Sequence, residues 1–265
     1  MAQPRVLILR APGTNCDVET AYAFERAGGR PERLHVNRLL ESPRRMAEFQ
    51  IFCLPGGFSY GDDIAAGRIL ANQIRHHLAD CMHEFHAAGK LILGICNGFQ
   101  ILLKSGMLLP LDRESSAGAT LAWNGSGKFE DRWVPLHTVG SKSVFFAGID
   151  SMYLPVAHAE GKFVPASESI FEALNAGGQF VLRYGSRPPA GIGQTLAARV
   201  PYPENPNGSL GDVAGVCDAT GRVCGLMPHP ERHIDPTQHP RWTRGPVAAT
   251  GDGIRVFQNA VGYFT

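Results

Sequence analysis

The sequence predicts an α/β protein with a mostly parallel sheet flanked by helices and extended by added antiparallel strands. Over residues 6–54, short apolar runs alternate with helical segments and glycine-rich turns, and this β-α-β-α-β order is typical of a parallel sheet with right-handed crossovers. A further apolar run at 91–93 leads through a cysteine into a helix. Short alternating segments separated by Gly, Ser and Thr turns follow later and indicate antiparallel strands.

The first half of the chain divides by its turn residues. We expect a strand at 6–9, a helix from Asp17 to the Gly28-Gly29 pair, a strand at 33–36, a short helix at 44–48 and a strand at 49–54. Asp62 or Asp63 can cap one long helix that ends at Gly89. Its apolar face repeats at close to 3.6 residues and consists of Ile64, Leu70, Ile74, Leu78, Met82 and Phe85.

The second half carries the signals of short strands and loops. Antiparallel hairpins at the sheet edge are expected over 119–139, a strand and turn at 153–163, a strand at 180–184, and a hairpin of 213–218 with 222–227. Loops rich in Pro, Gly and Asn occupy 186–193 and 202–210. Residues 232–250 form a polar surface extension before a final helix at 253–263, with Ile254, Phe257 and Val261 inward. One domain, 1–265, is predicted because no linker or repeat divides the chain.

Composition limits the possible function. Of 265 residues 44% are hydrophobic and 18% charged, and Lys+Arg 25 against Asp+Glu 24 gives a net charge of +1. This balance gives no electrostatic reason to expect nucleic acid or an anionic membrane as a partner. The N-terminus lacks the features of a signal peptide, and the six cysteines show neither a disulfide framework nor paired CxxC spacing. We therefore expect a cytoplasmic protein in a reducing compartment.

Cys96 lies at the sharp turn from a strand into a helix, in the sequence GICNG. This G-x-C-x-G pattern is a nucleophile elbow with Cys in place of Ser, and its glycines fit where the turn leaves no room for side chains. The helix N-terminus favours the thiolate. The backbone N–H of Asn97 is half of a candidate oxyanion hole. The alternative is a small buried hydrophobic residue that ends a core strand.

A candidate base follows the last predicted strand, in the sequence PHPE. The two prolines hold His229 in an extended segment, where residues i and i+2 project to the same side, so Glu231 can orient the imidazole. His158 is the rival base, because Glu160 also follows at i+2. Gly57, in a Gly-Gly turn after the strand at 49–54, is the candidate second oxyanion donor. The histidines at 76, 83 and 86 favour a solvated helix face over a metal site, and no metal is expected.

Five blocks of sequence together resemble the class I glutamine amidotransferases, in particular the branch that supplies ammonia for de novo purine synthesis. They are LRAPGTNCD at 9–17, GGFSYGD at 56–62, GICNGFQ at 94–100, PVAHAEG at 155–161 and GLMPHPER at 225–232. They run through nearly the whole chain in order. The stretch 233–250 is longer than the shortest members of this branch would have.

This resemblance implies a flavodoxin-like fold and a glutaminase. Cys96 would be the nucleophile, His229 the acid/base and Glu231 its orienting residue. Gly57 and Asn97 would supply the oxyanion hole, and Gln100 would lie where glutamine is held. No cofactor is implied for this chain, which lacks a GxxxxGK[ST] phosphate loop. ATP and Mg²⁺ would belong to a partner synthetase subunit, joined by a small bridging subunit.

Two other readings stay open at this point. The first is a cysteine peptidase or hydrolase on a related flavodoxin-like sheet. Such enzymes usually take their histidine from the segment directly after the cysteine, where this chain has Asn97, Gly98, Phe99 and Gln100. The second is a non-catalytic binding relative, against which the intact Cys96, His229 and Glu231 argue.

Overall fold

The structure, a computed structural model, describes residues 3–110, 118–139, 142–186, 200–246 and 248–265. The strands are β1 (Arg5–Arg10), β2 (Arg30–His35), β3 (Ile51–Leu54), β4 (Leu91–Ile95), β5 (Ala119–Trp123), β6 (Glu130–Thr138), β7 (Ser151–His158), β8 (Glu160–Pro165), β9 (Phe180–Tyr184), β10 (Val213–Cys217) and β11 (Val223–Leu226). The α-helices are α1 (Asp17–Arg26), α2 (Val36–Glu41), α3 (Arg68–His77), α4 (Ala79–Ala87), α5 (Asn97–Ser105), α6 (Glu168–Ala176) and α7 (Ile254–Gly262). The predicted α/β class is confirmed.

The parallel half of the main sheet holds the candidate site. The nine strands are ordered β2-β1-β3-β4-β11-β10-β9-β6-β7, and the first five of them pair in parallel. β3 and β4 are buried along their whole length, which explains their continuous apolar sequences. Since parallel strands end at the same edge, the segments that follow β1, β3, β4 and β11 meet there. Those segments contain Cys16, Gly57, Cys96 and His229.

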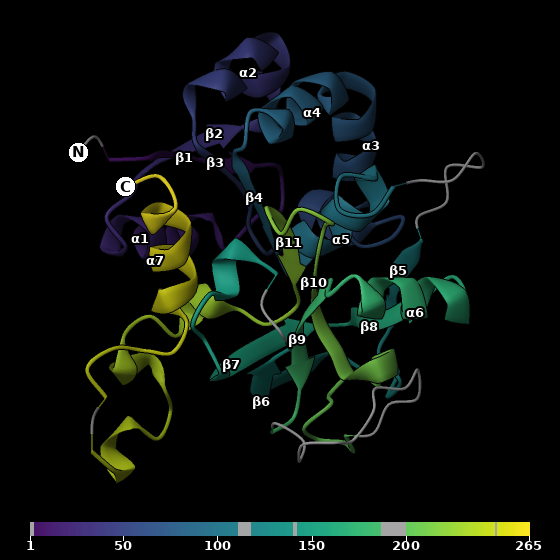
Figure 1. Cartoon of the computed structure of the whole chain (residues 1–265), viewed down its shortest axis with the longest axis vertical. Coiled ribbons are helices and arrows are strands. Elements are labelled where there is room, and N and C mark those ends of the chain that lie inside the picture. The colour runs from purple at the N-terminus through teal and green to yellow at the C-terminus, as the bar shows by residue number, and fades with distance from the viewer. Residues whose placement is uncertain (1–2, 111–117, 140–141, 187–199, 247) are drawn as a thin grey trace.

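Helices cover both faces of this sheet (Figure 1). α1 and α7 lie on one face, where the rings of Phe24 and Phe257 meet edge to face at 4.9 Å. α3 and α5 lie on the other. The last helix was predicted correctly, because Ile254, Phe257 and Val261 are all buried. Within the described ranges, no helix is long and apolar enough to cross a membrane.

The antiparallel additions differ in part from the sequence-based expectation. β10 and β11 form the predicted hairpin, and β9, β6 and β7 extend the sheet by antiparallel pairing. β5 does not join this edge. It pairs with β8 in a separate two-stranded sheet. The segment expected at 153–163 as one strand and a turn is two strands, β7 and β8. The proposed loop at 186–193 falls largely outside the described residues, and whether 1–265 is one domain stays a prediction.

Several expected boundaries in the first half were wrong. The long helix is two helices, since the backbone leaves the helical conformation at Leu78 between α3 and α4. It also starts later than expected: Ile64 is 67% exposed, and α3 begins after Gly67, whose left-handed φ is 71°. Asp62 nevertheless stands near that start and accepts the Gly67 N–H at 3.0 Å. The strand placed at 33–36 starts earlier as β2, and Val36 begins α2, which the sequence reading missed.

Residues 233–246 and 248–250 run away from the sheet as a series of short turns, visible at the lower left of Figure 1. Most of residues 239–246 and 248–250 are exposed, as predicted for a surface extension. The start of this stretch packs against other side chains, which the sequence did not predict. His233 and His239 pack with Trp133 and Tyr153 in a cluster of rings, with centroids 4.7 Å apart for Trp133 and His239.

Candidate functional site

Cys96 occupies a strained turn between β4 and α5. Its backbone angles are φ 52° and ψ −105°, an unusual conformation for a residue with a side chain. The neighbouring glycines are required by space. A Cβ on Gly94 would lie 2.6 Å from the carbonyl oxygen of Gly98, and a Cβ on Gly98 would overlap the Leu54 carbonyl on β3. The turn therefore has the geometry of a nucleophile elbow, and it sets the sulfur at the first turn of α5.

His229 and Glu231 form a buried pair directly after β11. His229 Nδ1 lies 2.6 Å from Glu231 Oε1, and the two side chains are 2% and 0% exposed. The backbone N–H of His229 donates to Pro155 O of β7 at 2.9 Å, which fixes the segment against a second strand. The expected side-by-side projection of these two residues is therefore present in the structure.

The electrostatics of this pair suit proton transfer. Burial alone would lower the pKa of His229, but the Glu231 carboxylate and the nearby sulfurs of Cys96 and Cys16 outweigh burial and raise that pKa well above its usual range. His229 Nε2 is buried and makes no hydrogen bond among the described residues. With Nδ1 bound to Glu231, this second nitrogen is the one available for a proton from Cys96 or from substrate.

The loop after β3 lies against His229 and the 13–16 loop. The N–H of Cys16 donates to Gly56 O at 3.2 Å, and the N–H of Phe58 donates to Gly13 O at 2.9 Å. Gly57 adopts φ 145°, and a Cβ there would lie 2.8 Å from the nitrogen of Asn15. Glycine is therefore needed at 57 both for its backbone angle and for its close contact with the 13–16 loop.

Strain continues along the same loop. Tyr60, Gly61 and Asp62 all have positive φ, at 54°, 72° and 53°. Asn97 holds the loop in place: its Oδ1 accepts the Ser59 N–H at 3.2 Å, and its Nδ2 donates to Asp62 Oδ1 at 3.1 Å. Consecutive strained residues of this kind cluster at ligand sites, where the surrounding structure enforces them.

A cavity of about 240 Å³ opens beside the cysteine. Eleven residues line it: Gly57, Phe58, Gly61, Asp62, Ala66, Cys96, Gln100, Trp123, His158, Ala159 and Glu160. Gln100 is held by two contacts, since its Oε1 accepts from Asn97 Nδ2 at 2.9 Å and its Nε2 donates to Glu160 O. Asp62 and Glu160 make one part of the lining acidic, and burial raises the pKa of Asp62.

The structure separates the two candidate bases. His158 does not pair with Glu160; its Nδ1 lies 3.1 Å from Asn124 Oδ1, while Glu160 Oε2 accepts the Ala66 N–H at 3.3 Å. Burial, followed by the charge of nearby His229, lowers the pKa of His158 to about 3. His229 alone of the two has a carboxylate that orients it.

The sequence assigned no role to Cys16, but in the structure it lies next to the His229–Glu231 pair. Its sulfur accepts from Arg232 Nη2 at 3.1 Å, and Arg232 Nε donates to Glu19 Oε1 at 2.9 Å. Burial raises the pKa of the Cys16 thiol to about 11. Donor atoms of Cys16, His229 and Glu231 lie within 4.8 Å of one another. The adjacent guanidinium opposes a cation there, so we assign no metal, and the sequence-based expectation of none stays a prediction.

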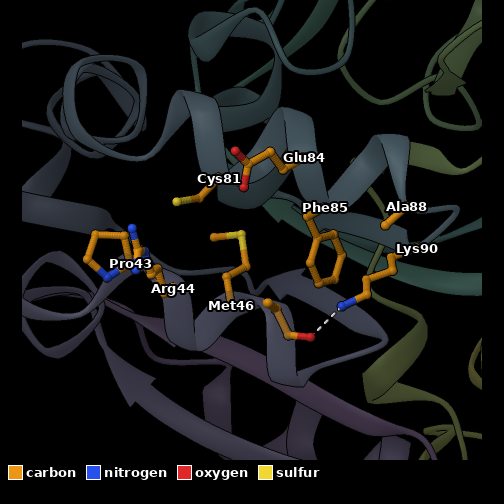
Figure 2. A pocket seen from close by; sticks show the side chains of 9 residues that line it. Pro43, Arg44, Met46, Cys81, Glu84, Phe85, Ala88 and Lys90 are labelled. Atoms are coloured by element: carbon orange, nitrogen blue, oxygen red, sulfur yellow. Dashed lines mark hydrogen bonds between the residues drawn. The ribbon is translucent and has the colours of Figure 1, made fainter.

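A second cavity, of about 420 Å³, lies at the opposite end of the strands, before β3 and β4 begin. Met46, Phe85 and Lys90 are among the residues that line it (Figure 2). Lys90 Nζ donates to the carbonyl oxygen of Ala47 at 2.6 Å. Burial lowers the pKa of Lys90 and raises that of Cys81. These residues include no base oriented by a carboxylate, so this cavity lacks the chemistry found beside Cys96.

A buried imidazole–carboxylate pair beside an elbow thiol is suited to acyl transfer through a thioester. The site and the doubly wound sheet thus define a class, the α/β enzymes that attack a carbonyl carbon with cysteine.

Comparison with known proteins narrows this class. The CobB/CobQ-like glutamine amidotransferase domain matches residues 3–264, and the chain belongs to that family. It is 48% identical over 262 residues to the phosphoribosylformylglycinamidine synthase subunit PurQ of Dehalococcoides mccartyi, covering 98% of each chain. It is 39% identical to the subunit of the same name from Methanococcus maripaludis, covering 98% of this chain and 97% of the other.

Solved structures agree in fold. A chain of the PurLQS structure from Thermotoga maritima matches with a TM-score of 0.73 and 30% identity, covering all of both chains. A glutamine amidotransferase from Thermotoga maritima matches with a TM-score of 0.53 at 16% identity, covering 92% of this chain and 82% of the other. The second likeness concerns the fold alone.

Proposed function

We propose that this chain hydrolyses L-glutamine to glutamate and ammonia through a thioester on Cys96. It is the glutaminase subunit of a phosphoribosylformylglycinamidine synthase and supplies ammonia to a synthetase subunit. That partner converts formylglycinamide ribonucleotide to formylglycinamidine ribonucleotide in de novo purine synthesis. The observation that carries the chemistry is the buried His229–Glu231 pair beside the elbow cysteine. The full-length identity to PurQ subunits supports the biological role.

In the first half-reaction His229 Nε2 takes the proton of Cys96, and the thiolate attacks the side-chain amide carbon of glutamine. The C=O π electrons move to oxygen, and the oxyanion accepts hydrogen bonds from the N–H groups of Gly57 and Asn97. Asn97 is the first residue of α5, where a backbone N–H has no partner within the helix. His229 then donates the proton to the nitrogen, ammonia leaves, and a γ-glutamyl thioester remains.

In the second half-reaction His229 removes a proton from water, which attacks the thioester carbon. The same two N–H groups stabilise the oxyanion, and collapse releases glutamate as the Cys96 sulfur regains its proton from His229. Glu231 stabilises the imidazolium formed in each half-reaction. Gln100, with Asp62 and Glu160, lines the part of the cavity that receives the rest of glutamine, and the two carboxylates suit its α-ammonium group.

The partner supplies the remainder of the synthase reaction. ATP and Mg²⁺ act in the synthetase subunit, and a small bridging subunit completes the complex. The resemblance to the PurLQS structure supports such an assembly. A cytoplasmic location follows from the biosynthetic role and from the scattered cysteines.

The test uses the complex of this chain with its synthetase partner. In the wild-type complex we expect both glutamine and free ammonia to support formylglycinamidine ribonucleotide synthesis. In Cys96→Ala we expect glutamine-dependent synthesis to be lost and ammonia-dependent synthesis to remain, because the synthetase site does not use the thiol. Cys81→Ala, in the cavity of Figure 2, is the matched control and should keep both activities.

Glutamine-dependent synthesis by Cys96→Ala would refute Cys96 as the nucleophile. A wild-type complex that hydrolyses a casein digest but not glutamine would support the cysteine peptidase. Failure of a glutamine-mimicking electrophile to label Cys96 in the wild-type protein would indicate that the chain is a non-catalytic relative.

A further inference from the structure

His158 is a buried residue that lines the glutamine cavity and has no part in the steps above. His158 ends β7, is 3% exposed and lines the cavity together with Cys96. The carbonyl oxygen of the preceding residue, Ala157, is 3.7 Å from Cys96 Sγ. The end of β7 therefore lies directly against the nucleophile.

Asn124 determines which nitrogen of this ring carries the proton. Asn124 Nδ2 donates to Lys128 O and to His158 O, both at 2.8 Å, so the orientation of the amide is fixed by two carbonyl oxygens. Asn124 Oδ1 must then face the ring, 3.1 Å from His158 Nδ1, while it also accepts the Gly161 N–H. An amide oxygen can only accept, so His158 Nδ1 holds the proton and Nε2 keeps a lone pair.

No group of the described residues donates a hydrogen bond to this lone pair. His158 Nε2 is buried and has no hydrogen-bond partner among the described residues. The lowered pKa keeps the ring uncharged at neutral pH. Buried acceptors are nearly always satisfied, because an unmade hydrogen bond costs free energy. A neutral acceptor without a protein donor, on a residue that lines the substrate cavity, is suited to a donor that the substrate brings.

We propose that Nε2 of His158 accepts an N–H of the glutamine carboxamide and so selects the amide over the carboxylate of glutamate. This inference deepens the proposed function and rests on it. The carbonyl oxygen of the carboxamide is taken by the N–H groups of Gly57 and Asn97, so its NH₂ group needs acceptors. Glutamate would place a carboxylate oxygen there, lone pair against lone pair, which favours release of the product.

The experiment compares His158→Phe, His158→Gln and wild type in the complex with the synthetase. We measure kcat/KM for glutamine and the inhibition constant of glutamate. A third readout is the rate at which 6-diazo-5-oxo-L-norleucine, a diazoketone without a carboxamide N–H, inactivates the enzyme. The exposed His77→Phe on α3 is the control for the same exchange away from the site.

In His158→Phe we expect kcat/KM for glutamine to fall roughly tenfold, since one hydrogen bond to substrate is lost. The ratio of the glutamate inhibition constant to the glutamine KM should fall by a similar factor, while the diazoketone still inactivates within about threefold of the wild-type rate. His158→Gln presents a neutral oxygen in place of Nε2. It should therefore keep most of the wild-type ratio of the glutamate inhibition constant to the glutamine KM.

An unchanged ratio in His158→Phe would overturn the proposal, as would equal losses for glutamine and for the diazoketone, which indicate a structural role. If His158→Phe does not fold, a ratio in His158→Gln more than tenfold below that of wild type overturns it. A wild-type complex that fails to hydrolyse glutamine refutes the proposed function itself, which distinguishes the two failures.

Discussion

Glu231→Gln removes the charge that faces His229 and keeps the shape of the side chain. In the wild-type protein the two groups are joined at 2.6 Å and are both buried. Because the imidazolium charge spreads over the ring, the charge centres lie about 4 Å apart, which corresponds to about 4 kcal/mol at an effective dielectric constant of about 20. A neutral hydrogen bond restores about 1 kcal/mol. The net loss of about 3 kcal/mol lowers kcat/KM for glutamine by roughly 10²-fold.

The assay is glutamate release by the complex, with single-turnover acylation measured in the same preparation. Ammonia-dependent synthesis is the internal control for folding and assembly and should not change. The pKa of His229 should also fall in this variant, because burial then acts without the opposing carboxylate. A decrease in kcat/KM smaller than threefold would refute the role given to Glu231.

Three further outcomes follow from the same geometry. Gly56→Ala places a Cβ 2.8 Å from His229 Cε1 and 3.0 Å from Cys16 Sγ. The imidazole must then shift, so glutaminase kcat should fall at least roughly tenfold. The control is Gly245→Ala, where a Cβ meets no atom within 4 Å, and it should leave kcat unchanged. The pKa of His158 falls to about 3 on folding, so this residue contributes stability above its usual pKa that is lost as the pH decreases. Urea denaturation at pH 6.5 and pH 4.5 should show an acid loss smaller by about 2 kcal/mol in His158→Gln than in wild type. Equal losses would contradict this. Docking of the synthetase with its own substrate and nucleotide should raise glutaminase kcat by up to roughly 10²–10³-fold, because it aligns the Gly57 N–H with the oxyanion. This alignment requires the hydrogen bond from the Cys16 N–H to Gly56 O to break. Equal kcat in all states would show that the oxyanion hole is preformed.

The sequence was sufficient where local chemistry determines the structure. The elbow glycines, the prolines around His229 and the apolar strands at β3 and β4 each act within a few residues, and the structure has the turn, the projection and the strands that they predict. The sequence interpretation failed where tertiary contacts decide. The periodic pattern over 64–85 continues across Leu78, so it gave no sign of the break between α3 and α4.

The rest of the site depends on contacts between distant segments. Cys16 meets Arg232 across 216 positions, and Asn124 meets His158 across 34. No spacing rule connects such pairs, so the sequence assigned no role to Cys16 and offered His158 only the nearby Glu160, at i+2, as a possible partner. The acidic lining by Asp62 and Glu160 likewise arises only when the loop after β3 reaches the end of β7.

The central claim is that glutamine is cleaved through a thioester on Cys96 with His229 as the acid/base. We would mix the complex with glutamine, quench it in acid within one turnover and locate the acyl group by peptide mass spectrometry. The account predicts a γ-glutamyl group on the peptide that contains Cys96 in wild type, and none in His229→Ala. A γ-glutamyl group on the neighbouring Cys16, or its formation on Cys96 in His229→Ala but not in His158→Ala, would contradict the account.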